Sequence, residues 1–272
     1  MLLAIDIGNT NTVLGVFTGP DLAASWRLTT QRAQTVDEMV LRVRGLFAGE
    51  GLDAQAITGV IVASVVPPLD SIVRAAATRL FGREPVFVGP GLKTGMAIHY
   101  QPPADVGADR IVNAVAGYAR ATANGAAGPV IIVDFGTATT FDVVSARGEY
   151  EGGIICPGMA IAAEALYQRT ARLPRVEPRR PEKLIGSTTV GSIQSGLYYG
   201  YLGLVDGILQ RLIAELGPGT QVIATGGMAP LLAGASRYIS AADEMLTLDG
   251  LRLIWERNAE PSAHANKPAP PR

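Results

Sequence analysis

The sequence contains one cysteine and two histidines among its 272 residues. The single thiol, Cys156, cannot form an internal disulfide, and His99 and His264 stand too far apart in the chain to supply a zinc cluster. An excess of charge of one sign is missing as well, because 23 basic and 24 acidic residues leave a net charge of −1. We therefore expect a cytoplasmic protein that binds neither nucleic acid nor a membrane surface.

A long uninterrupted apolar run is also missing. The first ten residues include no basic one, and Asp6 interrupts their apolar run, which argues against a signal peptide. The best candidate for a membrane span, 189–216, is broken by polar residues before about 18–20 apolar ones accumulate, so we expect an amphipathic core helix there. With 48% apolar and 17% charged residues, the chain can bury a large core, and its length favours two domains.

One short pattern occurs twice along the chain. Residues 2–7 and 12–17 are typical of two strands joined by the polar turn GNTN, and residues 130–144 repeat this arrangement. An offset of 128 residues aligns the copies at four positions: Asp6 with Asp134, Gly8 with Gly136, Thr12 with Thr140 and Val16 with Val144. The simplest interpretation is an internal duplication of one supersecondary unit.

The rest of the chain alternates between strand and helix patterns. The expected helices are 36–49, 69–81, 108–122, 158–171, 190–216 and 228–234, and the further expected strands are 59–65, 85–88 and 220–225. This alternation predicts an α/β protein with parallel strands beside each hairpin. We expect two similar lobes, residues 1–117 and 118–257, linked by the helix 108–122, and a disordered tail over 258–272.

Each copy of the repeat ends a strand with an aspartate and continues into a turn of glycine and hydroxyl residues. Such a turn offers backbone N–H groups and hydroxyls to phosphate oxygens, while the carboxylate can hold a divalent cation. Two copies could grip a polyphosphate from both sides, although the same residues also stabilise tight turns by local hydrogen bonds. The chain has no Walker motif and no G-x-G-x-x-G after a strand, which disfavours a P-loop or dinucleotide-binding fold.

The tetrapeptide GADR, residues 107–110, places an acid and a guanidinium side by side at the start of a predicted helix. The helix macrodipole favours an anionic carboxylate there, and a guanidinium can bind a carboxylate or phosphate with two hydrogen bonds. Asp109 is therefore a candidate general base and Arg110 a candidate anion clamp. The alternative is a helix-capping aspartate beside a solvated arginine.

Other segments also leave two interpretations open. The glycine pairs at 152–153 and 226–227 either let the backbone approach a substrate or nucleotide closely or form ordinary turns. The basic segment 172–188 is either a flap over an anionic ligand or a solvated loop. Cys156 has no neighbouring histidine or cation in the sequence, so we do not expect a nucleophilic thiolate.

Five motifs together resemble those of the type III pantothenate kinases. They are DIGNTNTVLG at 6–15, Tyr100 and Pro103 leading into VGADR at 106–110, DFGTATTFD at 134–142, GGIICPG at 152–158 and IGSTTVGSIQSGLYYG at 185–200. These kinases belong to the acetate and sugar kinase/actin-like superfamily, so the resemblance implies two actin-like, ribonuclease H-like lobes. It runs from residue 1 to about residue 257.

The resemblance also implies roles for particular residues. The positions that match ATP-binding residues are Asp6, Ile7, Gly8, Asn9, Thr10, Asn11, Thr12, Val13 and Thr137. Asp6 would lie close to Mg²⁺, and Asp134 would bind an activating monovalent cation, K⁺ or ammonium. The positions that match pantothenate contacts are Tyr100, Gly107, Ala108, Asp109, Arg110 and Thr189, with Asp109 as the proton acceptor.

The implied reaction is the ATP-dependent phosphorylation of pantothenate to 4′-phosphopantothenate, the first step of coenzyme A biosynthesis. The family is homodimeric, so the helix 190–216 is expected to contribute to a subunit interface. The sequence departs from the family pattern at Pro102 and at 187–188, which touch no expected catalytic group. The alternatives are another small-molecule kinase or a polyphosphate hydrolase built on the same lobes, and a nucleotide-binding regulator without kinase activity.

Overall fold

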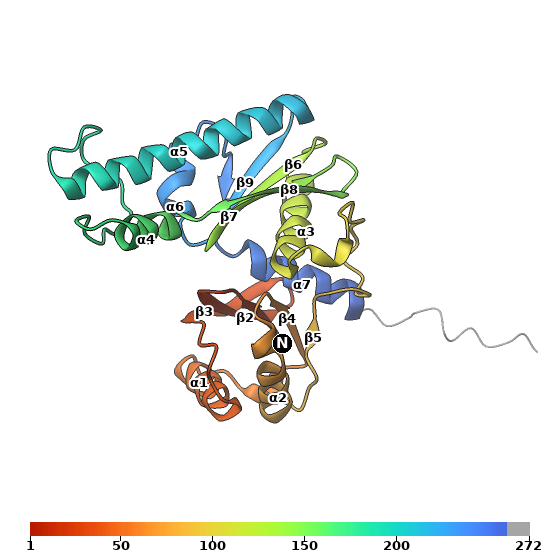
Figure 1. Cartoon of the computed structure of the whole chain (residues 1–272). Coiled ribbons are helices and arrows are strands. Elements are labelled where there is room, and N and C mark those ends of the chain that lie inside the picture. Colours follow the sequence, from red (N-terminus) through yellow and green to blue (C-terminus); the bar gives the residue numbers. More distant parts are fainter. Residues whose placement is uncertain (260–272) are drawn as a thin grey trace, which may run out of the picture.

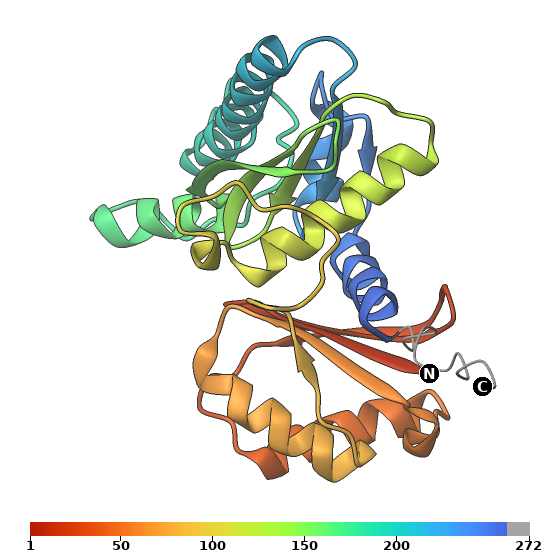
Figure 2. The ribbon, with the colours of Figure 1, turned by 90° about the vertical axis from the view of Figure 1, so that its right-hand side faces the viewer.

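The three inner strands of the first sheet are apolar on both faces. In the computed structural model, which describes residues 1–259, the first lobe contains β1 (Leu2–Ile7), β2 (Asn11–Thr18), β3 (Asp21–Thr29), α1 (Val36–Gly49), β4 (Gly59–Ser64), α2 (Asp70–Phe81) and β5 (Val86–Phe87). The strand order is β3-β2-β1-β4-β5, with β1 antiparallel to β2 and parallel to β4. Helices α1 and α2 cover its outer face (Figures 1 and 2).

The second lobe repeats this topology. It contains β6 (Val130–Phe135), β7 (Ala138–Val144), β8 (Tyr150–Pro157), α4 (Met159–Arg169), α5 (Thr189–Leu216), β9 (Gln221–Thr225), α6 (Ala229–Leu232) and β10 (Ala241–Ala242). The strand order β8-β7-β6-β9-β10 matches that of the first sheet strand for strand, with β6 antiparallel to β7 and parallel to β9. The predicted pair of similar α/β lobes is therefore confirmed.

The strand register corrects the alignment of the two repeats. Asp6 lies opposite Val13, whereas Asp134 lies opposite Thr140. The offset is 128 residues in the first strand of each hairpin but one residue less in the second, so Thr12 corresponds to Thr139 rather than to Thr140. The cause is the turn, which has four residues in the first hairpin (8–11) and three in the second (136–138).

Two helices lie between the sheets and join the lobes. Helix α3 (Ala108–Ala123) packs against β6 and β7 and also contacts β4, as expected for a linking helix. Helix α7 (Leu246–Ala259) crosses back from the end of the chain to β1, β2 and β4, where Leu248, Leu251 and Ile254 are buried. Figure 2 shows both helices between the two layers of strands. The division of the chain at 117/118 stays a prediction.

Most of the expected elements are present within a residue or two of their predicted bounds. Helix α1 coincides with the expected 36–49, because Thr35 and Glu38 form a capping box at its start. Helix α5 buries Leu197, Tyr201, Val205 and Leu209 on one side, which confirms an amphipathic core helix. Among residues 1–259, the structure contains no helix long and apolar enough to span a membrane.

Four strands and helices were not expected from the sequence. Strands β3, β8 and β10 and helix α7 had no predicted counterpart, and GGIICPG belongs to β8 rather than to a turn. The basic segment 172–188 is an exposed connection without helix or strand, where Arg175 pairs with Glu164 at 3.0 Å. The predicted disordered tail lies, apart from its first two residues in α7, outside the described residues.

Candidate active site

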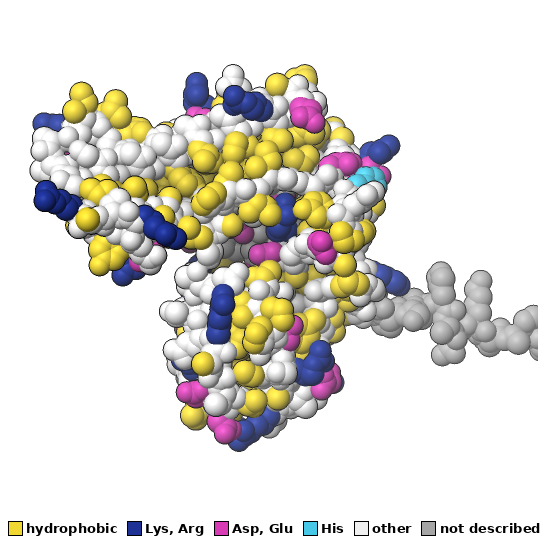
Figure 3. All heavy atoms as spheres, in the orientation of Figure 1, with side chains coloured by type: hydrophobic (Ala, Val, Ile, Leu, Met, Phe, Trp, Pro, Cys, Tyr) yellow, Lys and Arg dark blue, Asp and Glu magenta, His cyan; other side chains and the backbone are white. Residues whose placement is uncertain are grey.

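Two aspartates end the equivalent central strands of the two sheets. Asp6 is on β1 and Asp134 is on β6, and both are partly buried on the sides of their sheets that face the other lobe. Burial, with the neighbouring carboxylates Asp109 and Asp134 as the next cause, raises the pKa of Asp6 well above its ordinary value. Figure 3 shows a hollow between the lobes with acidic side chains along it, which we call the inter-lobe cleft.

The start of α3 adds the third carboxylate of this group. Asp109 is the second residue of α3, and its Oδ1 accepts a hydrogen bond of 2.8 Å from the backbone N–H of Arg110. A side chain at Gly107 would place its Cβ 2.6 Å from the same Oδ1, so glycine leaves the room that the carboxylate occupies. Burial raises the pKa of Asp109, while the Arg110 backbone and side chain oppose this shift. The carboxylate therefore binds a proton more readily than an exposed aspartate does.

A chain of hydrogen bonds from α3 and α7 positions the carboxylate of Asp134. The Asn113 amide on α3 donates to Asp134 Oδ2 at 3.0 Å, and the Thr247 hydroxyl on α7 donates to Asn113 Oδ1 at 2.7 Å. Burial and the charges of Asp109 and Asp142 raise the pKa of Asp134 to about 7. A buried group of carboxylates with oxygen donors is suited to a hard cation such as Mg²⁺ or K⁺, which would lower these pKa values again.

The two glycine-hydroxyl turns meet at the cleft. The hydroxyls of Thr10 and Thr137, from different lobes, lie 2.8 Å apart. The first turn is closed by a hydrogen bond of 2.9 Å from the Gly8 N–H to the Asn11 carbonyl, and the Arg32 guanidinium donates to Asn9 Oδ1 at 2.7 Å. Both segments expected to bind ATP phosphates are thus brought together.

Not every residue in the first segment offers its side chain to the cleft. Ile7 and Val13 are buried in the apolar cores, so a phosphate could meet only their backbone. The Thr12 hydroxyl is buried and lies 2.9 Å from the Thr30 hydroxyl. The exposed residues of this segment are Asn9 and Thr10, at the tip of the turn.

Arg110 is not the solvated arginine of the alternative interpretation. It is 8% exposed, and its Nε donates to Asp142 Oδ1 at 2.7 Å. The buried Asp142 also accepts hydrogen bonds from Tyr150 at 2.8 Å and from Thr140 at 2.9 Å. Arg110 Nη2 also lies 2.7 Å from Asp142 Oδ1, so an ion pair with Asp142 holds the guanidinium in place.

Tyr100 extends this network toward the surface. Its ring centroid lies 6.4 Å from that of Tyr150, and its ring would lie 3.6 Å from a Cβ on Gly152. The predicted substrate contacts Tyr100 and 107–110 are therefore neighbours in the structure. Asp142 and Tyr150 had no predicted role, although Asp142 ends the motif DFGTATTFD.

The structure does not place Thr189 beside the other predicted substrate contacts. Thr189 is the exposed first residue of α5, and the hydroxyl of the preceding Thr188 caps the helix by accepting the Gly191 N–H at 3.1 Å. Figure 1 shows this end of α5 projecting away from the place where the lobes meet.

The glycine at the end of β9 is required by its surroundings. Gly226 has a φ of 90°, and a Cβ there would lie 2.4 Å from Asp134 Oδ1 and 2.7 Å from the Phe135 backbone. The following Gly227 is exposed at the start of the turn that leads into α6. Cys156 lies on β8, and its burial raises the pKa of the thiol, in agreement with the prediction that it is not a thiolate nucleophile.

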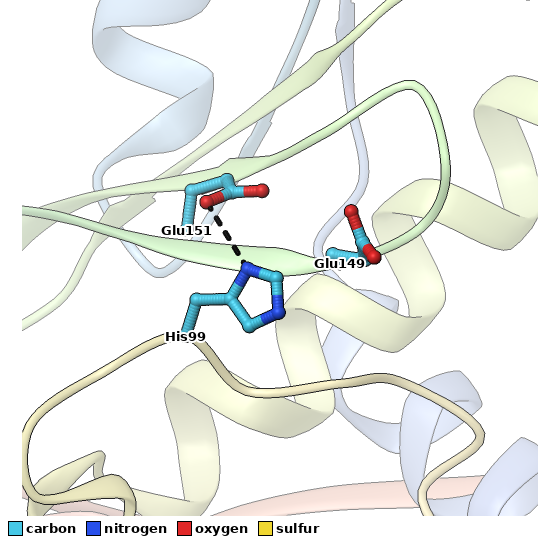
Figure 4. A group of neighbouring side chains, drawn as sticks. All are labelled: His99, Glu149 and Glu151. Atoms are coloured by element: carbon cyan, nitrogen blue, oxygen red, sulfur yellow. Dashed lines mark hydrogen bonds and ion pairs between the residues drawn. The ribbon is translucent and has the colours of Figure 1, made fainter.

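A different group of side chains lies at the start of β8. Glu149 and Glu151 face His99, whose Nδ1 is 3.4 Å from a Glu151 oxygen, and the three ligand atoms lie within 4.8 Å of one another (Figure 4). The sequence prediction considered only cysteine and histidine as metal ligands, so it did not find this group, which contains two glutamates. His264 lies outside the described residues. The His99 N–H also donates to the Tyr150 carbonyl at 2.8 Å, which ties the segment before Tyr100 to β8.

Comparison with known proteins shows the family of the chain. A family model described as type III pantothenate kinase matches residues 2–211. A type III pantothenate kinase of Koribacter versatilis (strain Ellin345) is 56% identical over 268 residues, which cover 95% of this chain and 96% of that protein. One of Anaeromyxobacter sp. (strain Fw109-5) is 57% identical over 258 residues, 95% of this chain and 100% of that protein.

The chain belongs to the type III pantothenate kinase family. This confirms the predicted resemblance and the predicted class of enzyme, a kinase that phosphorylates pantothenate in coenzyme A biosynthesis. Among solved structures, a ROK family glucokinase of Streptomyces griseus in complex with glucose and AMPPNP aligns with a TM-score of 0.54 at 14% identity, over 94% of this chain and 98% of that one. At this identity the likeness shows the shared two-lobed fold alone.

Proposed function

We propose that this type III pantothenate kinase transfers the γ-phosphoryl group of ATP to the primary hydroxyl of pantothenate in the inter-lobe cleft. The observation that carries this assignment is the convergence of Asp6, Asp109 and Asp134, whose charges act on one another at the ends of β1, β6 and the start of α3. Phosphoryl transfer depends on positioning and charge neutralisation rather than on a covalent enzyme intermediate.

Asp109 is the proposed general base. Its carboxylate accepts the proton of the pantothenate hydroxyl while the hydroxyl oxygen bonds to the γ-phosphorus. The bond from that phosphorus to the β–γ bridging oxygen breaks, and ADP leaves with the electron pair. The raised pKa of Asp109 suits this role, because a base is most effective when its pKa approaches the working pH. Arg110, held in place by its ion pair with Asp142, would orient the substrate through its positive charge.

The two glycine-hydroxyl turns are the proposed binding site for the ATP phosphates. A phosphate between them would replace the hydrogen bond between Thr10 and Thr137. Asp6 would hold Mg²⁺, and Asp134 would hold K⁺ or ammonium, since both offer carboxylate oxygens whose raised pKa values a cation would lower. When bound, these cations neutralise the charge of the polyphosphate.

The working unit is proposed to be a cytoplasmic homodimer. Exposed apolar side chains gather on α4, on the segment before α5 and on the first turns of α5, including Ile161, Tyr167, Leu184, Ile185 and Val190. We call this the projecting apolar patch, and Figure 3 shows hydrophobic side chains over this end of the second lobe. Patches of this kind mark protein interfaces. A second copy seated there would bring its own Thr189 toward the pantothenate contacts.

The test is ADP release from ATP and Mg²⁺, with and without pantothenate, in K⁺ and then in Na⁺ buffer. We expect turnover that requires pantothenate and K⁺ or ammonium. Phosphate release without pantothenate would instead identify a hydrolase, and turnover only with a different hydroxyl substrate would identify another small-molecule kinase. Nucleotide binding without any turnover would identify a regulator.

A further inference from the structure

Arg27 lies in register with Asp6, the proposed Mg²⁺ ligand of the first lobe. On the sheet, Asp6 of β1 pairs with Val13 of β2, and Val13 pairs with Arg27 of β3. Directly opposed residues of antiparallel strands point to the same face, and two strand spacings amount to roughly 10 Å. Arg27 and Asp6 therefore share one face of the first sheet, two strands apart.

The alternation of β3 identifies that face. Trp26 and Leu28 pack into the core under α1 and α2, together with Ile5 and Ile7 of β1. Arg27, between them, must point to the opposite side, where Val13 packs and where the second lobe begins. The guanidinium Nη1 lies 4.0 Å from the position that a Cβ would take on Gly227 of the second lobe. The side chain thus spans the cleft from one lobe to the other.

Arg27 is also the cation that acts on the two buried aspartates. Its charge lowers the pKa of both Asp6 and Asp134, although burial outweighs it in each case. Within residues 1–259, Arg27 forms no ion pair, and its side chain is exposed. The other arginines of the site are engaged, since Arg110 pairs with Asp142 and Arg32 donates to Asn9.

The second lobe has no equivalent cation. The same register on its sheet runs from Asp134 through Thr140 to Ile155, which is 60% exposed. A structural requirement of the repeated unit would place arginine in both copies or in neither. The arginine is therefore found only on the first lobe's side of the cleft, where the turn 8–11 lies.

We propose that Arg27 binds the polyphosphate of ATP across the cleft, opposite the second-lobe turn at Gly227. A nucleoside triphosphate adds several negative charges beside three carboxylates, and a guanidinium suits phosphate oxygens because it donates two parallel hydrogen bonds. Arg27 offers its charge from the first lobe and reaches the second one, so it would hold the phosphates and draw the lobes together. This role rests on the proposed kinase function, since it concerns the same nucleotide.

The test compares Arg27→Gln and Arg27→Lys with Arg44→Gln, a matched substitution at an exposed arginine of α1 on the other side of the first sheet. Binding of the Mg²⁺ complex of AMPPNP, and of AMP, is measured by calorimetry, and turnover is measured with pantothenate. We expect Arg27→Gln to weaken AMPPNP binding and kcat/KM for ATP by about 10- to 100-fold, the usual range for a charged hydrogen bond. AMP binding and the KM for pantothenate should stay within about threefold of wild type, and Arg27→Lys should be intermediate.

The outcomes separate this proposal from the assignment of the reaction. AMPPNP binding of Arg27→Gln within threefold of wild type, or an equal loss of AMPPNP and AMP binding, would overturn the role of Arg27. A wild-type protein that binds AMPPNP through Arg27 but forms no phosphopantothenate would overturn the kinase assignment alone. Matching thermal unfolding curves for the variants and wild type exclude a folding defect.

Discussion

Asp109, the proposed base for the pantothenate hydroxyl, lies at the start of α3, where its charge acts on both Asp6 and Asp134. Asp109→Asn keeps the shape and the hydrogen bond from the Arg110 N–H but cannot accept a proton. We expect kcat to fall by about 10²–10⁴-fold with ATP binding largely kept. The exposed Asp105→Asn, four residues away, is the matched control. Steady-state kinetics measure this effect. A kcat within threefold of the wild-type kcat would show that Asp109 is not the base.

Asp134 makes stability depend on pH in a definite direction. Its pKa is raised from 3.8 to about 7, so the folded protein binds this proton more tightly than the unfolded chain does. Stability is therefore lost as the pH rises through this range, and the whole penalty is present above pH 7. Asp134→Asn removes the buried charge, and we expect it to stabilise the cation-free protein at pH 8 by about 1–3 kcal/mol.

Urea unfolding in chelator-treated buffer, at pH 8 and near pH 4, measures this effect. The gain should disappear near pH 4, where wild-type Asp134 is protonated when folded. Asp21→Asn, at an exposed aspartate of β3, should change stability little at either pH. If Asp134→Asn were equally stable or less stable at pH 8, the charge on Asp134 would not be the source of the penalty.

Single residues of the site were predictable where a local motif carries them. Asp6, Asp109 and Asp134 each stand next to a glycine-containing turn or helix start, which a sequence shows directly. Asp142 and Arg27 were missed because their partners come from other elements: Asp142 meets an arginine 32 residues away, and Arg27 meets the second lobe. Their roles depend on strand register and packing, which no local pattern encodes.

At the scale of the element, the turn after β9 supports the site by lying against β6. Gly226→Ala would bring a methyl group to 2.4 Å from Asp134 Oδ1 at a residue with φ of 90°. We expect a loss of about 2–4 kcal/mol, from the left-handed backbone and from overpacking. Gly234→Ala, where nothing lies within 4 Å of the added atom, is the control and should stay within about 0.5 kcal/mol of wild type.

Guanidinium unfolding curves of the two alanine variants give the comparison. A loss confined to Gly226→Ala, accompanied by weaker activation by K⁺, would show that the turn positions Asp134. Equal stability of both variants would mean that the turn relaxes without cost, and the close contact of β9 with β6 would then be unimportant for the site.

The unexpected elements have physical reasons for being hard to predict. Strand β3 alternates between exposed and half-buried residues, and its burial depends on helices that follow it in the chain. Helix α7 buries Leu248, Leu251 and Ile254 against the first lobe's sheet, but its sequence is only weakly amphipathic. By contrast, α1 begins with a capping box and α3 has strong periodicity, so their bounds were predicted almost to the residue.

For the whole molecule, the proposed homodimer would link Thr189, which lies away from the other predicted substrate contacts, to a substrate site. The projecting apolar patch carries Ile185 at 84% exposure and Leu184 at 63%, which is unusual for large apolar side chains of a protein that works as a monomer. We expect Ile185→Asp to convert a dimer into a monomer, observed by light scattering. Leu41→Asp, at a 67% exposed leucine of α1 outside the patch, should leave the dimer intact. A wild-type monomer would contradict the proposed interface.

Mixed dimers then test whether Thr189 acts on the site of the other subunit. A closed two-fold dimer contains two equivalent sites, each made of one subunit's Asp109 and the other subunit's Thr189 under this arrangement. Asp109→Asn and Thr189→Val are each expected to be impaired as homodimers, but their co-expressed mixture contains one site with both native residues. Pantothenate-dependent activity should therefore reappear in the purified mixed dimer. If both residues served the same subunit's site, every site in that dimer would hold one defect, and no activity would return.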